Sequence, residues 1–358
     1  RPGLLHRDAY RWFWLHPCFD PIMAASATIL GCSGPRLTPD EKRFFAKADP
    51  WGFILFGRNV EAPDQLRALC ADLRTAIGRN APILIDQEGG RVQRLRSPHW
   101  QEFPPALDQI TALRPSDVAR AMWLRGRLIA HDLADVGIDV NCAPNLDLVT
   151  PQTHVFLKNR CYGSDPDRVA LAARALVDGM AQGGVLAVMK HMPGHGRAGL
   201  DTHHALPRIS TGRDDLYRHD FAPFAALNDL PMAMTAHIVF EAIDAEAPAT
   251  CSDTVIDLIR RDIGFQGLLM TDDISMQALT GSLCARSAAA ISAGCDVVLH
   301  CNGVQLEMAE VTAAAGVLSA AAQSRAAVAL AARTAPQPVD IKALRAEFDA
   351  MLRGQGDG

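Results

Sequence analysis

The sequence predicts an α/β protein that forms a single domain, a (β/α)8 barrel of the TIM type. The first observation is that eight short apolar runs alternate with stretches that have helix signals, which is the pattern of parallel α/β proteins. The second is that polar residues able to carry chemistry follow these runs, as they do at the carboxyl ends of barrel strands. No G-x-G-x-x-G fingerprint of an open nucleotide-binding sheet follows the early strands, and this favours a closed barrel.

The predicted strands are short and rich in apolar residues. In chain order they are Ala27–Gly31, Gly52–Phe56, Pro82–Ile85, Ile138–Ala143, Val185–Lys190, Pro231–Ala236, Gly267–Thr271 and Asp296–Leu299. Helices between them are predicted from capping residues, from proline at the first helical position and from apolar periodicity. They begin after Thr38 and then cover Pro63–Ile77, Ser116–Val136, a stretch ending at Gln182, Asp214–Leu227, Thr254–Arg261, Ser282–Ala293, Val311–Ala335 and Val339–Leu352.

Composition excludes several classes of partner. Hydrophobic residues make up 49% of the 358 residues and charged residues 21%, as in an ordinary globular protein with a large core. The net charge is −5 with no basic block, so we expect no nucleic acid and no membrane as partners. The nine cysteines are scattered without a C-x-x-C pair, which predicts free thiols in a reducing compartment and hence a cytoplasmic protein. We also expect a monomer.

The N-terminal residues differ from the rest of the chain. Residues 1–22 begin with Arg1 and lack both periodicity and the apolar core of a secretory signal, so we interpret them as an added or upstream extension outside the fold. The barrel domain is predicted over residues 23–358. The run Ile29–Cys32 resembles a lipoprotein attachment site, but without a basic and apolar leader ahead of it a strand is the better interpretation.

The stretch from Lys190 to Pro207 has the densest chemistry in the chain. Its eighteen residues, KHMPGHGRAGLDTHHALP, include one lysine, four histidines and one aspartate with three interspersed glycines. Ionisable side chains on a glycine-rich backbone just past a strand predict a catalytic loop, although a polar loop of solvated histidines is the alternative. The glycines also predict that Gly196–His204 is displaced or poorly ordered without ligand.

Asp272 is the strongest candidate for a nucleophile. A carboxylate directly after a buried strand can attack an anomeric carbon and hold a covalent glycosyl intermediate. Alternatively, Asp272 or Asp273 could cap a helical segment over Ile274–Leu279. We assign the chemistry to Asp272 and the capping or support to Asp273.

A retaining glycosidase also needs a proton donor for the leaving oxygen. The loop offers His203, which Asp201 could orient and stabilise in its charged form. Glu88 is the alternative donor, and it could equally brace its turn. We favour His203.

Other polar residues suit sugar binding. Charge-assisted hydrogen bonds from Asp86, Arg160, Lys190 and His191 could fix a hexose. Alternatively, Arg160 pairs with Asp165 to shape its loop. His237 could line the pocket or support Lys190.

Metal binding is weighed separately. His191-x3-His195 and His203-His204 suggest a metal site, but amidohydrolase barrels need an H-x-H after the first strand, where this chain has Gly31-Cys32-Ser33-Gly34. We therefore expect no metal and no organic cofactor.

Five motifs in consistent order resemble glycoside hydrolase family 3, and more narrowly its single-domain bacterial β-N-acetylglucosaminidases of peptidoglycan recycling. These motifs are DQEGGRVQRL (86–95), NRCYGSDP (159–166), KHMPGHG (190–196), DTH (201–203) and TDDISM (271–276). The resemblance implies a (β/α)8 barrel with Asp272 as nucleophile and His203, paired with Asp201, as acid/base. It implies that the sugar contacts are Asp86, Arg94, Arg160, Lys190 and His191. The implied substrate is N-acetylglucosamine β-1,4-linked to 1,6-anhydro-N-acetylmuramic acid, with or without its peptide, in the cytoplasm.

The chain also departs from the family pattern. Met192 stands where the family usually has Phe, Cys161 where it commonly has Ser, and the segment His154–Lys158 differs from what usually precedes the arginine. Two rival functions remain open. A phosphorylase on the same frame would use phosphate in place of water, since a neutral histidine does not repel the dianion. A catalytically silent muropeptide-binding protein is the other.

Overall fold

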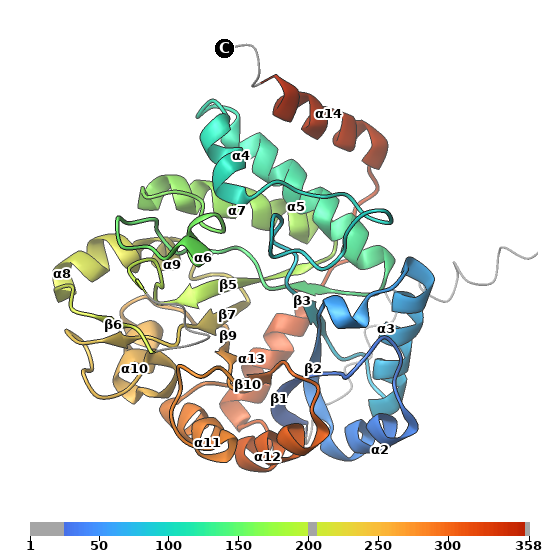
Figure 1. Ribbon diagram of the computed structural model, residues 1–358, viewed down its shortest axis with the longest axis vertical. Coiled ribbons are helices and arrows are strands. Elements are labelled where there is room, and N and C mark those ends of the chain that lie inside the picture. The colour runs from blue at the N-terminus through green and yellow to red at the C-terminus, as the bar shows by residue number, and fades with distance from the viewer. Residues whose placement is uncertain (1–24, 200–205, 355–358) are drawn as a thin grey trace, which may run out of the picture.

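In a computed structural model of the chain, residues 25–199 and 206–354 are described (Figure 1). Eight parallel strands close into a barrel in the order β1-β10-β9-β7-β5-β4-β3-β2, which confirms the predicted fold class. The barrel strands are β1 (Ser26–Gly31), β2 (Pro50–Leu55), β3 (Ile83–Ile85), β4 (Val140–Asn141), β5 (Leu186–Met192), β7 (Met232–Thr235), β9 (Leu268–Asp273) and β10 (Val297–His300). Closure joins the first strand to the last, with Thr28 paired to Val298.

Helices surround the barrel, as Figure 1 shows. They are α2 (Pro39–Ala48), α3 (Pro63–Ile77), α4 (Ala106–Ala112), α5 (Val118–Asp135), α6 (Val155–Lys158), α7 (Pro166–Gln182), α8 (Arg213–Asp215), α9 (Ala222–Ala226), α10 (Asp253–Arg261), α11 (Leu283–Ala293), α12 (Gln305–Ala315), α13 (Ala320–Ala331) and α14 (Ile341–Arg353). Two 3-10 turns, η1 (Gly57–Asn59) and η3 (Ala249–Cys251), and the π-helical turn η2 (Leu216–Asp220) lie between these helices and strands. Strands β6 (Arg208–Ile209) and β8 (Val239–Phe240) form a separate two-stranded sheet. Within the described ranges, no helix combines the length and the apolar character that crossing a membrane requires.

The start of α2 illustrates how local sequence sets an element boundary. The Glu41 amide donates to the Thr38 hydroxyl at 3.1 Å, and the Glu41 carboxylate accepts the Thr38 amide at 2.9 Å. This reciprocal pair satisfies two amide groups that a helix end leaves open, and such caps stabilise a helix by roughly 1 kcal/mol. The Glu41 carboxylate also accepts the Ser33 amide at 2.8 Å, which ties the loop after β1 to the helix.

One helix prediction was wrong in its continuity. The predicted helix over 214–227 is broken into α8, η2 and α9, because Pro223 has no amide hydrogen for the carbonyl four residues earlier. The outer helices predicted over 311–335 are α12 and α13, although α12 begins earlier, at Gln305, and ends just before Gly316, which has φ 67°. The short helices α4 and α6 have no counterpart in the sequence prediction, since neither shows sustained periodicity.

One strand boundary matters for the site. The apolar pattern ends β5 at Lys190, but the strand continues to Met192 with a shift of register against β7 between Met189 and Met192. Lys190 and His191 therefore lie within the strand, where the barrel backbone fixes them. Residues 1–22, the predicted extension, fall outside the described residues, so the domain boundary remains a prediction.

Candidate active site

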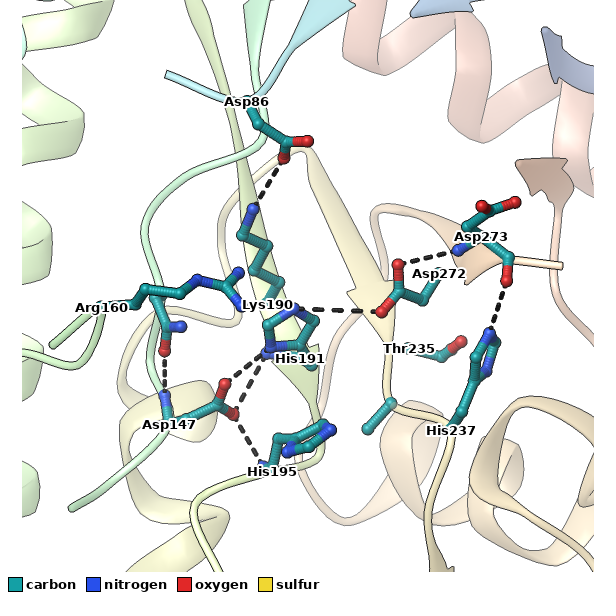
Figure 2. Close-up of polar contacts among 12 residues, drawn as sticks. Asp86, Asp147, Arg160, Lys190, His191, His195, Thr235, His237, Asp272 and Asp273 are labelled. Atoms are coloured by element: carbon teal, nitrogen blue, oxygen red, sulfur yellow. Dashed lines mark hydrogen bonds and ion pairs between the residues drawn. The ribbon is translucent and has the colours of Figure 1, made fainter. Parts of the chain in front are cut away.

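Those predicted site residues that the structure describes converge at the carboxyl-terminal mouth of the barrel. Lys190 and His191 lie on β5 and Asp272 on β9, while Asp86 directly follows β3 (Figure 2). Parallel strands bring their carboxyl ends to one edge, and closure of the barrel turns that edge into a ring. The mouth therefore gathers side chains that are up to 186 positions apart in the chain, from Asp86 to Asp272.

A buried network of ion pairs forms one side of the mouth. The Lys190 ammonium lies 2.9 Å from Asp86 Oδ1 and 2.6 Å from Glu88 Oε1, with only 2% of its side chain exposed. The Arg160 guanidinium donates to both Glu88 oxygens, at 3.0 and 2.8 Å. Arg94 donates to Asp86 Oδ2 at 3.0 Å. Two carboxylates and three cations thus share one network of charge-assisted hydrogen bonds.

This network fixes the charge of its members. Burial alone raises the pKa of Glu88, but Arg160 and Lys190 outweigh burial and hold it at about 2. Burial likewise opposes ionisation of Asp86, yet Lys190 and Arg94 keep its pKa well below the usual range. The two carboxylates in turn overcome the effect of burial on Lys190 and raise its pKa above the ordinary value. Glu88 is therefore anionic at neutral pH and braces Arg160 and Lys190.

Asp272 lies apart from these cations. The Asp273 amide donates to its Oδ1 at 2.8 Å, while Oδ2 lies 4.0 Å from Nε2 of His191 (Figure 2). Burial raises the pKa of Asp272, but His191, His237 and the Asp273 amide outweigh it and hold the pKa below its usual range. Its side chain is 19% exposed, so an ionised carboxylate remains accessible at the mouth.

Asp147 orients His191, a role that the sequence reasoning missed. The fully buried Asp147 Oδ2 lies 2.7 Å from Nδ1 of His191, and Oδ1 accepts the backbone amides of His191 and His195 at 3.2 and 2.7 Å. Because a carboxylate only accepts, Nδ1 of His191 carries the hydrogen, and Nε2 is the nitrogen that faces Asp272. The signal for Asp147 in the sequence is its place in the loop that follows β4, at the carboxyl end of a barrel strand.

His237 contacts neither the open mouth nor Lys190, which corrects both predicted roles. Its ring is fully buried, with Nε2 3.0 Å from the Asp273 carbonyl and Nδ1 2.7 Å from the Thr250 hydroxyl. The alternative interpretation, an ion pair between Arg160 and Asp165, is also wrong. Arg160 pairs with Glu88, while Asp165 caps α7 by accepting the Arg168 amide at 3.0 Å.

Asp273 supports the site, but not by capping a helix. Residues 274–279 form turns, and the Asp273 carboxylate accepts the amide and hydroxyl of Ser275 at 3.1 and 2.8 Å. It also accepts the Cys301 amide at 3.3 Å, across to the exit of β10.

Two of the three residues predicted to be catalytic, Asp201 and His203, fall outside the described residues. The segments before and after them are fixed to the mouth. The Gly196 carbonyl accepts the Thr153 hydroxyl at 2.5 Å, and Arg197 pairs with Asp220 at 2.8 Å. On the far side, β6 (Arg208–Ile209) pairs with β8 (Val239–Phe240), which follows β7.

Gly196 was predicted to give the loop freedom to swing, and the structure gives it a different role. A Cβ atom at Gly196 would lie 1.9 Å from the Leu148 carbonyl oxygen. The residue is glycine because the backbone after β4 approaches it closely. Gly196 is therefore packed in place, whereas Gly199 is exposed. Residues 200–204 of the segment predicted to be displaced, Gly196–His204, fall outside the described residues, so for them the displacement stays a prediction.

The described residues offer no alternative site of comparable chemistry. A cavity of about 810 Å³ lies at the opposite end of the barrel, near Ala27 and Asp296, and none of the predicted site residues lines it. No group of three or more His, Cys, Asp or Glu side chains within the described ranges could hold a metal ion. The arrangement suits nucleophilic attack by Asp272 on a bound polar substrate that the ion-pair network holds.

The family model of the glycosyl hydrolase family 3 N-terminal domain matches residues 33–333 of this chain. A β-hexosaminidase of Alkalilimnicola ehrlichii is 39% identical over 290 residues, covering 78% of this chain and 82% of that protein. A β-hexosaminidase of Bordetella avium is 36% identical over 288 residues, with the same coverage of 78% and 82%.

A solved structure is also similar. NagZ from Neisseria gonorrhoeae, determined in complex with N-trifluoroacetyl-D-glucosamine, superposes with a TM-score of 0.79 at 28% identity. The match covers 94% of this chain and 100% of that one.

Proposed function

The chain belongs to glycosyl hydrolase family 3 and is a β-N-acetylhexosaminidase, and we propose that it is a retaining, exo-acting enzyme that forms a covalent glycosyl-enzyme on Asp272. The proposed substrate is a muropeptide fragment, N-acetylglucosamine linked to 1,6-anhydro-N-acetylmuramic acid with or without peptide. The proposed location is the cytoplasm. His203, paired with Asp201, is the proposed acid/base.

The position and charge of Asp272 carry the proposal. It is an ionised carboxylate at a strand end, with one oxygen held by a backbone amide and the other facing the mouth. Because Lys190, Arg94 and Arg160 pair with Asp86 and Glu88, none of these three cations forms an ion pair with Asp272. A carboxylate that is held through Oδ1 while Oδ2 has no Lys or Arg partner suits attack on an anomeric carbon.

The carboxyl groups of the mouth also bear on the identity of the acid. A carboxylic acid that protonates a leaving group at neutral pH needs a raised pKa. Here the pKa values of Asp86, Glu88, Asp147 and Asp272 are all lowered. Glu88, the alternative donor, is the least suited, since Arg160 and Lys190 hold it as a carboxylate. This supports a histidine donor, and His203 belongs to the loop whose fixed flanks reach the mouth.

The proposed reaction has two balanced steps. In the first, Asp272 Oδ2 forms a bond to C1 as the bond from C1 to the glycosidic oxygen breaks, and His203 gives its proton to that oxygen. In the second, neutral His203 takes a proton from water, whose oxygen bonds to C1 as the Asp272 carboxylate leaves. The network of Asp86, Arg94, Arg160 and Lys190 binds sugar hydroxyls through both steps.

Covalent trapping tests the nucleophile. A 5-fluoro N-acetylglucosaminyl donor should inactivate the wild type, and mass spectrometry of its peptides should place the sugar on Asp272. Asp272→Asn should fold normally and should not be labelled, because an amide is a poor nucleophile. A sugar on Asp273 or Glu88 would overturn the assignment.

Product analysis tests the reaction itself. With a chromogenic N-acetylglucosaminide, the proposal expects free N-acetylglucosamine whether or not phosphate is present. N-acetylglucosamine 1-phosphate as the main product in phosphate buffer would instead identify a phosphorylase. Absence of turnover on both this donor and a muropeptide fragment would indicate a binding protein.

A further inference from the structure

We propose that Asp273 and His237 are positioning residues that hold Oδ1 of Asp272 and so commit Oδ2 to the attack on the sugar. The inference rests on the proposed role of Asp272 as nucleophile. It assigns a function to a buried histidine that lies behind the mouth and to the second aspartate of the TDD sequence.

Asp273 is immobilised on each of its polar groups. Its carboxylate accepts from Ser275 at 2.8 and 3.1 Å and from the Cys301 amide at 3.3 Å, while its carbonyl lies 3.0 Å from His237 Nε2. The remaining group, its amide hydrogen, points to Asp272 Oδ1 at 2.8 Å (Figure 2). The direction of that hydrogen bond is therefore fixed by anchors on three other segments of the chain.

The protonation of His237 follows from its partners. The Asp273 carbonyl can only accept, so Nε2 of His237 carries a hydrogen. Burial holds the pKa of His237 below its usual value, so the ring is neutral at pH 7 and Nδ1 is an acceptor. The Thr250 hydroxyl has one hydrogen and two acceptors in reach, Nδ1 of His237 at 2.7 Å and the Ala236 carbonyl at 3.1 Å. Because Nδ1 of neutral His237 is an acceptor and the nearer of the two, we assign the hydrogen to it. Thr235, at 2.8 Å, donates to the Thr250 oxygen in turn.

This chain of hydrogen bonds has one consequence for catalysis. The Thr250 hydroxyl selects the tautomer of His237 that donates to Asp273, and Asp273 in turn holds Asp272 Oδ1. The carboxylate of Asp272 cannot rotate without breaking that bond, so Oδ2 remains the oxygen nearest the mouth. Displacement of a reacting atom by about 1 Å can cost about 10²-fold in rate.

Thr250 provides the sharpest test because it lies behind His237 and touches no substrate group. Thr250→Val keeps the shape and removes the hydroxyl, whereas Thr250→Ser keeps the hydroxyl. The experiment measures the rate of glycosyl-enzyme formation per active site with a 2,4-dinitrophenyl N-acetylglucosaminide, whose leaving group needs no acid. It also measures the dissociation constant of N-acetylglucosamine and the melting temperature.

We expect Thr250→Val to slow glycosyl-enzyme formation by about 10- to 100-fold. The dissociation constant of N-acetylglucosamine should stay within about threefold, because the sugar contacts are untouched. Thr250→Ser should recover most of the rate. The proposal is overturned if Thr250→Val forms the intermediate at the wild-type rate per active site, or if Thr250→Ser is as slow as Thr250→Val.

A second pair of variants covers the case in which Thr250→Val does not fold. His237→Gln retains a side-chain donor toward the Asp273 carbonyl, and His237→Leu removes it. The rate for His237→Gln should exceed that for His237→Leu by about tenfold, and equal rates per active site would overturn the proposal. If Asp272 is not the nucleophile, the fluorosugar will not label Asp272 in the wild type, and this result distinguishes failure of the proposed function from failure of the positioning roles.

Discussion

Nε2 of His191 lies 4.0 Å from Oδ2 of Asp272, the oxygen to which we assign the nucleophilic attack. The ring is held in this orientation from behind, where Asp147 accepts from Nδ1 and from two backbone amides. His191 is thus a neighbour of the reacting oxygen as well as a predicted sugar contact. The tautomer of the His191 ring decides whether Nε2 presents a lone pair or a hydrogen toward the mouth and Asp272.

Asp147→Asn is expected to reverse that tautomer. The two backbone amides of His191 and His195 require an acceptor, so the asparagine oxygen should take the Oδ1 position and its NH2 should face Nδ1. The hydrogen of the ring then moves to Nε2, where its partial positive charge faces the Asp272 carboxylate at 4.0 Å and weakens it as a nucleophile. We expect kcat/KM to fall about 10²-fold or more with little change in melting temperature. Asp147→Ala, which leaves both amides unpaired, should in contrast unfold more easily.

His203→Ala should affect substrates according to their need for a proton. We expect a severe loss on the natural disaccharide and a milder one on an aryl glycoside with an acidic phenol, as measured by kcat/KM. Glu88→Gln should reduce both by the same factor, because the structure gives Glu88 a bracing role toward Arg160 and Lys190. If Glu88→Gln instead lowers kcat/KM much more on the natural disaccharide than on the aryl glycoside, Glu88 is the acid.

Acid should destabilise the wild type through Glu88. Its pKa is about 2 in the folded protein and near 4.5 in the unfolded chain, so the unfolded state binds protons first as pH falls. The stability that ionised Glu88 contributes is complete above pH 4.5 and is lost as pH falls from there toward 2. Urea unfolding at pH 6 and pH 3 should show a larger loss for wild type than for Glu88→Gln. Equal losses of unfolding free energy in the wild type and in Glu88→Gln would contradict the low pKa of Glu88.

Asp132 on α5 should show the opposite pH dependence. Within the described residues its Oδ2 has no hydrogen-bond partner, and burial raises the pKa to about 6 despite Arg345 at 3.5 Å. The folded state therefore favours the protonated form, so its penalty is absent below pH 3.8 and grows as pH rises to 6. Asp132→Asn should stabilise the protein at pH 7 by about 1–2 kcal/mol, with the gain disappearing near pH 4. If Asp132→Asn instead destabilises the protein at pH 7, the ionised Asp132 carboxylate has interactions in the folded protein that outweigh the cost of its burial.

Two glycines near the catalytic loop form a matched pair. Gly196→Ala would push a methyl group into the Leu148 carbonyl, whereas at Gly199 the nearest atom to a Cβ is the Gln152 oxygen at 3.6 Å. We expect Gly196→Ala to destabilise the protein by about 1–3 kcal/mol and to reduce turnover, because the backbone must shift. Gly199→Ala should be close to wild type in both thermal melting and kcat. If Gly196→Ala and Gly199→Ala have similar melting temperatures and kcat values, the backbone at Leu148 moves away from a methyl group at position 196 at little cost.

Much of the fold was predictable because its signals are local. Apolar runs bounded by turn residues located all eight barrel strands, and the cap at Thr38 located the start of α2. One wrong boundary has a local cause, since Pro223 breaks a helix that apolar periodicity alone would continue. The other depends on strand pairing, since β5 continues past its apolar run to Met192, which pairs with Thr235 of β7.

The sequence by itself determined which segments lie at the mouth, since the carboxyl ends of all eight parallel strands point to that end of the barrel. It did not determine which side chains open into the mouth, because His237 follows β7 and is fully buried behind it. Only the tertiary structure decided what each one contacts. Glu88 and Arg160 are 72 positions apart and Lys190 and Asp86 are 104 apart, and no local pattern encodes their pairing. The ion pair that lowers the pKa of Glu88 and the hydrogen bond that turns His237 toward Asp273 both depend on distances that barrel closure sets. Charge and tautomer follow from such contacts, because a buried polar group takes the state that its neighbours can satisfy.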